Sequence, residues 1–363
     1  MLLIVFSVLP LLEAKADSPS VYGKVRVSYN IFDTDNDPMG MRSERDNTFI
    51  ASHSSRIGFK GTELLENNYL FKYQVEIGVK VNGDEDNDYF SLRNSFATIG
   101  HTDFGQISAG RLNTAYKSVT SKIDVFSGTV ADYNQVVGAA SSLKGSKFFN
   151  VRADQIILYN SPTWDGVNLS ASYSGDQNIN DGNSYENIYN ASLGFKYTLK
   201  HWSFYLGHEV HNNSTIIGDA QSIKKYKDTA IKYAVLYKTP SFRSGFIFES
   251  TETDSVDKHK TRDIFLLNTA YTTNKTTYKA QYWEALKSAK SNLDYSAKGL
   301  SFGVSYKFNT EIEASLIYSH INNNKNGKYG FNAGTSPTVD IKGDDNNPRL
   351  SILSLGINYH FGY

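Results

Sequence analysis

Apolar and polar side chains alternate with a period of two along most of this chain. Between residues 21 and 32 the odd positions are almost all apolar, whereas most of the even positions carry Lys, Arg, Ser or Asn. Between residues 69 and 80, Tyr, Phe, Val and Ile occupy the odd positions, and Lys, Gln and Glu occupy most of the even ones. Because successive side chains of a β-strand point to opposite faces, both segments predict strands with one apolar face and one wet face.

Segments of this kind recur about sixteen times, and most are close to the roughly 9–11 residues that a tilted strand needs to cross a bilayer. They lie at residues 21–32, 54–62, 69–80, 89–99, 104–111, 152–161, 166–174, 187–198, 202–211, 228–238, 241–249, 262–271, 276–284, 298–308, 312–321 and 349–361. Strands inside a membrane satisfy all their backbone donors and acceptors only when they close into a barrel. The sequence therefore predicts an all-β fold, an antiparallel transmembrane β-barrel of about sixteen strands.

The connections between these segments alternate strictly between short and long. Short ones lie at 64–68, 101–103, 199–201, 239–240, 272–275 and 309–310, and long ones at 33–53, 82–88, 112–150, 175–186, 212–227, 251–260, 286–297 and 322–348. In outer-membrane barrels the short turns lie at the periplasmic rim and the long loops face outside. A soluble β-sandwich has no reason to sort its loops by length, so the alternation favours the membrane barrel.

The third long connection, at about residues 112–150, lacks the strand alternation and predicts no regular secondary structure. A connection of roughly forty residues inside a compact domain is usually either functional or disordered. This one carries Val, Phe, Tyr, Ala and Leu along its length, which favours an ordered loop. We expect it to fold into the hollow of the barrel and to narrow the channel.

Composition excludes several other classes of protein. The 37 Lys and Arg residues balance the 37 Asp and Glu residues, so no overall basic field attracts nucleic acid. Cysteine is absent, which removes disulfides, thiolate catalysis and Cys-ligated metal sites. Beyond the N-terminus, no segment approaches the roughly 20 apolar residues of a membrane-spanning helix. We expect no cofactor and no resident metal ion.

The first sixteen residues predict a secretory signal peptide. An apolar run extends from Leu2 to Leu12, and Ala14-Lys15-Ala16 follows it as a small-x-small cleavage site. Cleavage after Ala16 would leave residues 17–363 as the mature barrel, exported to the Gram-negative outer membrane.

Short stretches that are spread in order over the mature chain carry a family resemblance. They are Val21-Tyr22-Gly23-Lys24, the segment from Ser55 to Glu63, Asp103-Phe104-Gly105-Gln106, Ala109-Gly110-Arg111, the segment from Arg152 to Ile156, Tyr159-Asn160-Ser161-Pro162 and the aromatic last strand. Taken together they resemble the trimeric general-diffusion porins of the Gram-negative outer membrane. The resemblance implies a homotrimer in contact with outer-membrane lipid and lipopolysaccharide, with the third loop folded into each barrel.

The resemblance also implies a charged constriction, where basic side chains of the wall face acidic side chains of the third loop. The residues carried over are Lys24, Arg56, Arg93 and Arg152 on the wall, with Arg26 added because it shares the face of Lys24, and Asp124 and Asp132 on the loop. Alternation places Lys24, Arg56 and Arg93 on the wet faces of their strands, and it leaves the face of Arg152 open.

These features predict a water-filled channel for the passive diffusion of small hydrophilic solutes and ions. Opposed charges at the narrowest point would set a transverse field that orients dipolar solutes and disfavours apolar ones. Selectivity between cations and anions stays open, because the basic wall and the acidic loops oppose each other.

An enzyme on the same barrel is not expected. Catalysis by a hydrolase needs a nucleophile, a base and an orienting acid in contact. Alternation puts His208 and Glu209 on opposite faces of their strand, and no serine lies in a nucleophile motif.

A substrate-specific channel, an adhesin or a phage receptor is the alternative function. The acidic segments from Asn82 to Asp88 and at Asp344-Asp345 offer ligands for Ca²⁺ or for ions that bridge lipopolysaccharide, although solvated external loops account for them too. A sugar channel would need a run of aromatic side chains along the lumen, and only Trp283 and Tyr205 fit that pattern.

Overall fold

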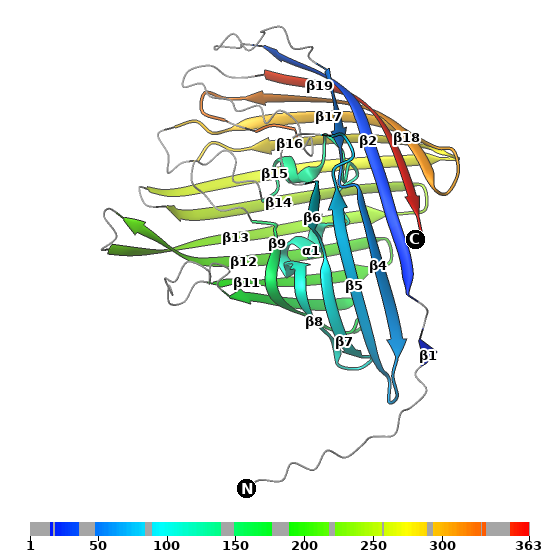
Figure 1. Ribbon diagram of the computed structural model, residues 1–363. Helices are drawn as coiled ribbons and strands as arrows, with labels where there is room; N and C mark the ends of the chain where they lie inside the picture. The colour runs from blue at the N-terminus through cyan, green and yellow to red at the C-terminus, as the bar shows by residue number, and fades with distance from the viewer. Residues whose placement is uncertain are drawn as a thin grey trace.

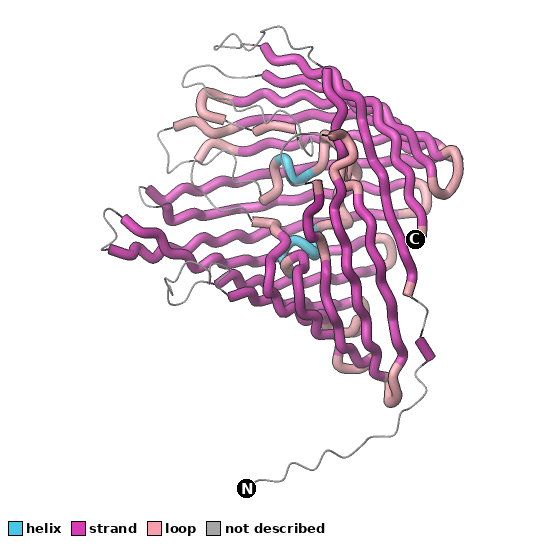
Figure 2. The backbone as a smooth tube through the Cα atoms, in the orientation of Figure 1, coloured by secondary structure: helices cyan, strands magenta, loops and turns pink. Residues whose placement is uncertain are grey.

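The computed structural model of the chain is a closed barrel of antiparallel strands (Figures 1 and 2). It describes residues 15–16, 19–35, 48–83, 89–138, 149–175, 189–217, 222–255, 258–288, 293–327, 329–331 and 349–362. Neighbouring strands follow one another in chain order, and the last strand pairs with β2 to close the ring. Closure leaves the sheet without an open edge, which is the condition for crossing a bilayer with strands.

The wall is built from strand segments that combine into sixteen strands. The segments are β1 (Lys15–Ala16), β2 (Ser20–Asp35), β3 (Thr48–Ser52), β4 (Arg56–Leu64), β5 (Tyr69–Val79), β6 (Phe90–Leu92), β7 (Ser95–His101), β8 (Gly105–Asn113), β9 (Arg152–Asn160), β10 (Val167–Gly175), β11 (Tyr189–Leu199), β12 (Trp202–Ile217), β13 (Ser222–Lys238), β14 (Phe242–Ser255), β15 (Lys258–Thr273), β16 (Thr276–Ala285), β17 (Ala297–Lys307), β18 (Ile312–Asn323) and β19 (Arg349–Phe361). Both β3 and β4 pair with β2, so they are two parts of one strand. In the same way β6 and β7 both pair with β5, and β1 pairs with β4 in line with β2. The sixteen-stranded barrel predicted from the sequence is confirmed.

The two faces of each strand differ as the alternation predicts. On β2, Val21 and Tyr29 are exposed on the outer face, with 59% and 49% of their surface accessible. Ser28 and Asn30, on the other face of the same strand, are buried inside the barrel. In the part of the chain that the structure describes, no helix is long and apolar enough to cross a membrane. The apolar outer band is therefore the surface that meets lipid.

Two external connections are shorter than the sequence predicts. Residues 212–227 and 251–260 were expected to be long loops, but β12 extends to Ile217 and β13 begins at Ser222, while β14 extends to Ser255 and β15 begins at Lys258. The predicted strand ends were wrong here because hydrophobic alternation ends where the lipid ends. Backbone pairing needs no apolar side chains and continues beyond that level, as the projecting β12–β13 hairpin shows (Figure 1).

The third loop lies inside the barrel, and it contains regular structure that its sequence pattern did not predict. A helix, α1 (Ala115–Thr120), follows β8, and a 3-10 turn, η1 (Tyr133–Gln135), lies farther along the loop (Figure 2). The side chain of Thr114 caps α1 by accepting the backbone N–H of Lys117. A helix of six residues is too short to show a 3.6-residue hydrophobic period, which explains why the pattern missed it.

Apolar packing holds this loop against the inner wall. Ile123 joins a buried cluster with Ile247 and Leu266, and Phe126 joins a second one with Ile317. Wall glycines make room for the close approach, since a side chain at Gly303 would collide with the Phe126 ring. The loop is thus a packed part of the interior, and the channel passes beside it.

Candidate functional site

Irregularities in the wall strands position basic side chains of the predicted constriction. One wall strand is interrupted between β3 and β4, just before Arg56, and another is interrupted between β6 and β7, at Arg93. The ladder between β8 and β9 shifts register next to Arg111. Breaks and bulges re-aim side chains that a regular pleat would direct elsewhere. Three arginines are therefore placed where the wall departs from the regular strand that the sequence predicts.

The first interruption is stabilised by side chains that replace ladder hydrogen bonds. The hydroxyl of Ser55 accepts the backbone N–H of Arg26 at 3.0 Å and donates to its carbonyl at 3.1 Å. Ser54 takes a positive φ of 54°, which turns the chain between the two strand segments. His53 is buried, and its Nε2 lies 2.7 Å from the hydroxyl of Ser28. These contacts give the interruption a defined conformation, which fixes the direction in which the Arg56 side chain enters the lumen.

Glu76 on β5 connects two of the predicted wall residues. Its carboxylate lies 3.1 Å from Nε of Arg56 and accepts a hydrogen bond from Nε of Arg93 at 2.7 Å. Tyr22 donates its hydroxyl to the same carboxylate at 3.0 Å. Arg56 and Arg93 are therefore held side by side by one shared acid. The sequence places Glu76 on the wet face of its strand, but nothing in the pattern marks it as the group that joins these arginines.

Arg152 joins this group from the next part of the wall. Its Nε donates to the side-chain oxygen of Asn94, the residue that follows Arg93 at the second strand interruption. Arg111 forms an ion pair with Asp154 and donates to the carbonyl of Leu92 at 2.8 Å. The structure thus brings Arg152 next to Arg93, a proximity that strand alternation alone left open.

Lys24 and Arg26 approach this group of arginines from β2. Lys24 pairs in register with Arg56 on the neighbouring strand, so both side chains lie on the lumen face. The guanidinium of Arg26 donates to the carbonyls of Ser127 at 2.5 Å and Gly128 at 2.6 Å. Gly128 has a positive φ of 67°, a conformation that glycine adopts without strain. Arg26 therefore ties the wall to the third loop.

The two predicted loop acids lie close to Arg26, but their carboxylates are used within the loop itself. Asp124 is 6% exposed and accepts the backbone N–H groups of Phe126 at 2.8 Å and Tyr133 at 3.2 Å. Asp132 is 5% exposed and accepts the backbone N–H of Gly128 at 2.6 Å and that of Asn134 at 2.9 Å. Both acids stabilise turns of the loop and present little surface to the channel.

Burial also weakens the charge of one of these acids. It raises the pKa of Asp124 well above its usual range, and the negative charge of Asp132 raises it further, against the opposing effect of the two backbone N–H donors.

The loop also contributes a cation, Lys117, that the family resemblance did not predict. Lys117 lies on α1, and burial together with the nearby charge of Arg152 lowers the pKa of its ammonium group to about 8. Across the lumen, the guanidinium of Arg243 donates to the carbonyls of Lys122 and Ile123, the latter at 3.1 Å. Arg243 lies on the wet face of β14, so alternation alone could have placed it in the lumen.

A buried cluster of charges anchors the loop on the wall formed by β12 to β15. Glu249 accepts hydrogen bonds from the hydroxyl of Tyr116 at 2.8 Å, the backbone N–H of Gly138 at 2.7 Å and the guanidinium of Arg262 at 2.8 Å. The ammonium of Lys232 lies 3.8 Å from the centre of the Tyr116 ring. Burial and the negative charge of Glu249 raise the pKa of Tyr116, so its hydroxyl keeps its proton.

The same cluster continues along β12 and beyond the third loop's helix. Lys232 also donates to the side-chain oxygen of Asn150 at 2.8 Å. Nε2 of His211 lies 2.9 Å from the carboxylate of Glu209, and both side chains are buried. His208, by contrast, is exposed on the outer face, as alternation predicts. The wall residues that hold the loop are spread over four strands, which is why no local motif reveals them.

The features that suggested a specific ligand do not form an open site. Trp283 is fully buried and packs against Tyr329 at a ring-centre distance of 5.4 Å, and Tyr205 is buried in the same apolar cluster. Their rings therefore offer no sliding surface to a sugar. The described residues contain no group of three or more His, Asp or Glu side chains that could hold a metal ion. Most of the acidic segment 82–88, and Asp344-Asp345, lie outside the described residues.

Comparison with known proteins agrees with this architecture. The family model described as "Gram-negative porin" matches residues 12–327. The major outer membrane protein P.IB of Neisseria sicca is 35% identical over 134 residues, and a P.IB protein of Neisseria gonorrhoeae is 29% identical over 137 residues. These alignments span 37% and 38% of this chain, and only 35% and 37% of the two relatives.

A solved structure that covers nearly the whole barrel is the anion-selective porin from Comamonas acidovorans. It has a TM-score of 0.77 and 18% identity, and the match covers 96% of this chain and 100% of that one. The trimer form of OmpT of Vibrio cholerae has a TM-score of 0.64 and 18% identity, with 96% and 99% of the two chains covered. At these identities the structures support the fold alone. Together with the match of the family model, they show that this chain belongs to the Gram-negative porin family of outer-membrane β-barrels.

Proposed function

We propose that this porin is a passive diffusion channel for small hydrophilic solutes and ions, and that it prefers anions. The observation that supports the proposal is the different placement of basic and acidic side chains at the predicted constriction. Basic side chains converge there from β2, β4, β6–β7 and β9, whereas the loop acids Asp124 and Asp132 accept hydrogen bonds from the loop's own backbone. The wall acids beside these cations are Glu76 and Glu313, so the basic side chains at the site outnumber the acids that face them.

The wall arginines keep much of this positive charge despite their acidic partner. Glu76 is one carboxylate shared between Arg56 and Arg93, so it offsets one of two positive charges. Arg152 uses the neutral side chain of Asn94 as its partner. Fixed cations around a narrow aqueous path raise the local anion concentration and repel cations.

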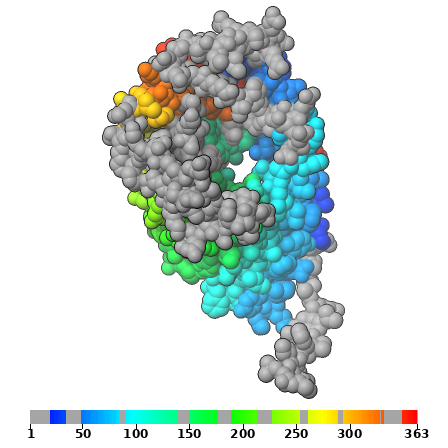
Figure 3. Space-filling model, turned by 60° about the vertical axis from the view of Figure 1, so that its left-hand side comes forward, coloured from blue at the N-terminus to red at the C-terminus, as the bar shows by residue number. Residues whose placement is uncertain are grey.

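The geometry also leaves room for flow. In the space-filling view the barrel remains open beside the part of the wall coloured blue to cyan, which carries β2 to β8 (Figure 3). Lys24, Arg26, Arg56 and Arg93 lie on this wall, and Arg152 lies on the adjoining strand β9. Among the solved structures, the porin of Comamonas acidovorans is itself described as anion-selective, which supports the same preference here.

The test is the reversal potential of the refolded mature protein in a planar bilayer under a tenfold KCl gradient. Anion preference makes the dilute side negative, because chloride crosses ahead of potassium. A positive dilute side would refute the preference. Absence of conductance from protein that is folded, as judged by heat-modifiable migration on a gel, would refute the channel itself.

We further propose that the protein is exported with a signal peptide at residues 1–16 and assembles as a homotrimer among lipid and lipopolysaccharide. The apolar run from Leu2 to Leu12 and the following Ala14-Lys15-Ala16 support the cleavage site. The trimer form of the Vibrio cholerae relative supports the assembly. N-terminal sequencing of protein from outer membranes, and mass measurement in detergent, test the two statements separately.

A further inference from the structure

A groove lies on the outer, lipid-facing surface of the barrel, across β15 to β18. It has a volume of about 580 Å³, and Ala280 and Gly303, which carry no side chain beyond Cβ, are among the residues that line it. Large side chains surround these small residues, and they include Phe302 and Tyr278, which are 50% and 54% exposed. Small residues between large ones thus hollow the wall at this place.

The groove follows from the register of the strands. Thr269 on β15 pairs with Ala280 on β16, and Ala280 pairs with Phe302 on β17, so the three share one level of the outer face. The hydroxyl of Thr269 donates to the carbonyl of Arg243 at 3.2 Å, which satisfies this polar group within the wall. Lys279 also lines the groove, but alternation turns its side chain to the lumen, where charged groups of the loop and wall face it. The groove therefore presents a mainly apolar surface.

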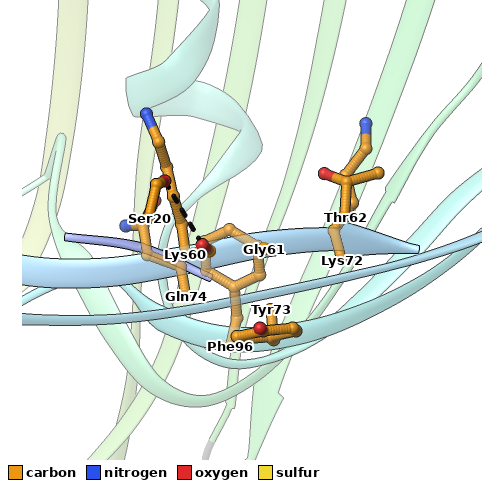
Figure 4. Close-up of a pocket in the computed structure, with 8 residues that line it drawn as sticks. All are labelled: Ser20, Lys60, Gly61, Thr62, Lys72, Tyr73, Gln74 and Phe96. Carbon is orange, nitrogen blue, oxygen red and sulfur yellow. Dashed lines mark hydrogen bonds between the residues drawn. The ribbon is translucent and has the colours of Figure 1, made fainter. Parts of the chain in front are cut away.

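A hollow in another part of the wall has the opposite chemistry. On β4 and β5, Lys60, Lys72 and Gln74 line a pocket of about 280 Å³. Figure 4 shows the two lysines projecting from the same side of the sheet. Such a polar pocket is suited to water, whereas the outer groove, with Leu316 and Leu353 in its wall, is suited to hydrocarbon.

The depth of the groove corresponds to one leaflet of the membrane. Lys275 lies in the short turn between β15 and β16, which belongs to the periplasmic rim. Ala280 lies on β16, and the five residues between the two positions span roughly 17 Å at about 3.4 Å per residue. A strand tilt of about 35–45° reduces this to about 12–14 Å of depth, close to half of a hydrocarbon core about 25–30 Å thick. Lipids of the periplasmic leaflet therefore reach the groove with their chains.

A cation lies at the rim, on the periplasmic side of the groove. The ammonium of Lys275 donates to the carbonyl of Phe308 at 3.2 Å, so it lies between the β15–β16 turn and the end of β17. An ammonium has three donors and can hold this carbonyl and a phosphate oxygen together. The exposed rings of Tyr271 and Tyr278, which pair in register, lie between the rim and the groove, where aromatic side chains meet lipid headgroups. Glu311, in the turn that follows Phe308, can face the amine of a headgroup.

We propose that the groove binds an acyl chain of a phospholipid from the periplasmic leaflet, with the phosphate of its headgroup held by Lys275. Bulk lipid is as apolar as the groove, so affinity comes from the packing of the chain in a fitted hollow and from the charge-assisted hydrogen bond to the phosphate. The volume equals roughly nineteen water molecules at about 30 Å³ each, and a methylene group is about as large as a water molecule, so one chain fits. The proposal rests on the outer-membrane location of the barrel and is independent of its ion selectivity.

The test is native mass spectrometry of the refolded mature protein in detergent, titrated with phosphatidylethanolamine. We expect saturable retention of one lipid per protomer. Lys275→Met should raise the apparent dissociation constant at least about tenfold, since a charge-assisted hydrogen bond is worth roughly that factor in affinity. Ala280→Phe places a ring in the groove and should cause a similar loss. Diacylglycerol, which has the chains without the phosphate, should bind at least about tenfold more weakly than the phospholipid.

The matched controls are Lys200→Met and Ala171→Phe. Lys200 lies in the short turn between β11 and β12, and Ala171 lies on the outer face of β10, so both are outside the groove. Both controls should retain the lipid as the unmodified protein does, and heat-modifiable migration on a gel confirms that each barrel is folded. Unchanged retention in Lys275→Met and Ala280→Phe, or an equal loss in the controls, would overturn the site.

Two other outcomes would also count against the proposal. Equal affinity for diacylglycerol and for phosphatidylethanolamine would show that the chains bind without the cation at the rim. A change in the oligomer's mass in Ala280→Phe, with no lipid retained by the unmodified protein, would assign the groove to a second copy of this chain. The reversal potential in KCl tests the proposed channel separately, because loss of the lipid site leaves conduction standing and a cation preference leaves the lipid site standing.

Discussion

The buried cluster at Glu249 should control how firmly the third loop is held in the barrel. Glu249 is fully buried and receives three hydrogen bonds, two of them from the loop and one from Arg262. Glu249→Gln keeps the size of the side chain, but it removes the negative charge and leaves Arg262 buried without its counter-charge. Breaking a buried ion pair on one side costs about 3–5 kcal/mol. The docking equilibrium of the loop should shift by roughly two to nearly four orders of magnitude.

The assay is single-channel recording at constant voltage, where movement of the loop appears as flicker in the open current. We expect frequent partial closures in Glu249→Gln. Tyr116→Phe removes one hydroxyl and should give a weaker effect, from a loss of about 1–3 kcal/mol. Glu284→Gln is the control, because Glu284 lies on the outer face of β16 with the exposed Tyr282 and pairs with Lys298, whose side chain is 59% exposed.

Noise in Glu249→Gln equal to that of the Glu284→Gln control would refute the anchoring argument. A larger effect of Tyr116→Phe than of Glu249→Gln would refute the central place given to the carboxylate. Heat-modifiable migration on a gel confirms in each case that the barrel itself is folded.

Three further predictions concern the charges at the proposed constriction. Glu76→Gln should increase anion preference in a KCl gradient, because it removes a negative charge that lies beside Arg56 and Arg93. It should also cost about 2–3 kcal/mol in stability against thermal or urea unfolding through the lost charge-assisted bonds. Anion preference should fall as pH rises through about 8, because Lys117 is positive below that pKa and neutral above it; Lys117→Gln should remove this step from the reversal potential. Asp132→Asn should leave the reversal potential nearly unchanged and should raise the current noise, because the carboxylate stabilises a turn of the loop and its loss costs about 1–3 kcal/mol. A large change in selectivity without added noise would show that Asp132 faces the pore.

The barrel could be predicted from the sequence because its determinants are local and repeated. Alternation of side chains sets the two faces of a strand, and the sorting of loops by length sets the two ends of the barrel. This reasoning mispredicts strand ends where backbone pairing continues beyond the alternation of apolar and polar side chains. Strand β12, for example, continues to Ile217, past the last apolar alternation, because its backbone bonds to β13 need no lipid-facing side chains.

The candidate site could be predicted only in part. Lys24, Arg56 and Arg93 lie on wet faces by alternation, so their presence in the lumen follows from the strand pattern. Their partners do not follow, because Arg93 lies in the interruption between β6 and β7, opposite Glu76 on β5, and the sequence pattern does not predict that interruption. Such an interruption depends on contacts between residues that are distant in the sequence. At the interruption between β3 and β4, for example, the Ser55 hydroxyl bonds to the backbone of Arg26, and a local sequence pattern does not predict this contact.

The loop and the wall divide their charges in a way that ties selectivity to folding. A loop that turns back on itself inside a barrel must satisfy backbone N–H groups away from bulk water, and here Asp124 and Asp132 accept them. The same loop leaves carbonyls facing the wall, and wall cations such as Arg26 and Arg243 donate to those. The carboxylates of these loop acids therefore accept hydrogen bonds within the loop, whereas the remaining wall cations line the water path. The anion preference proposed here is thus a consequence of how the loop folds, so variants that reorganise the loop should change conductance and selectivity together.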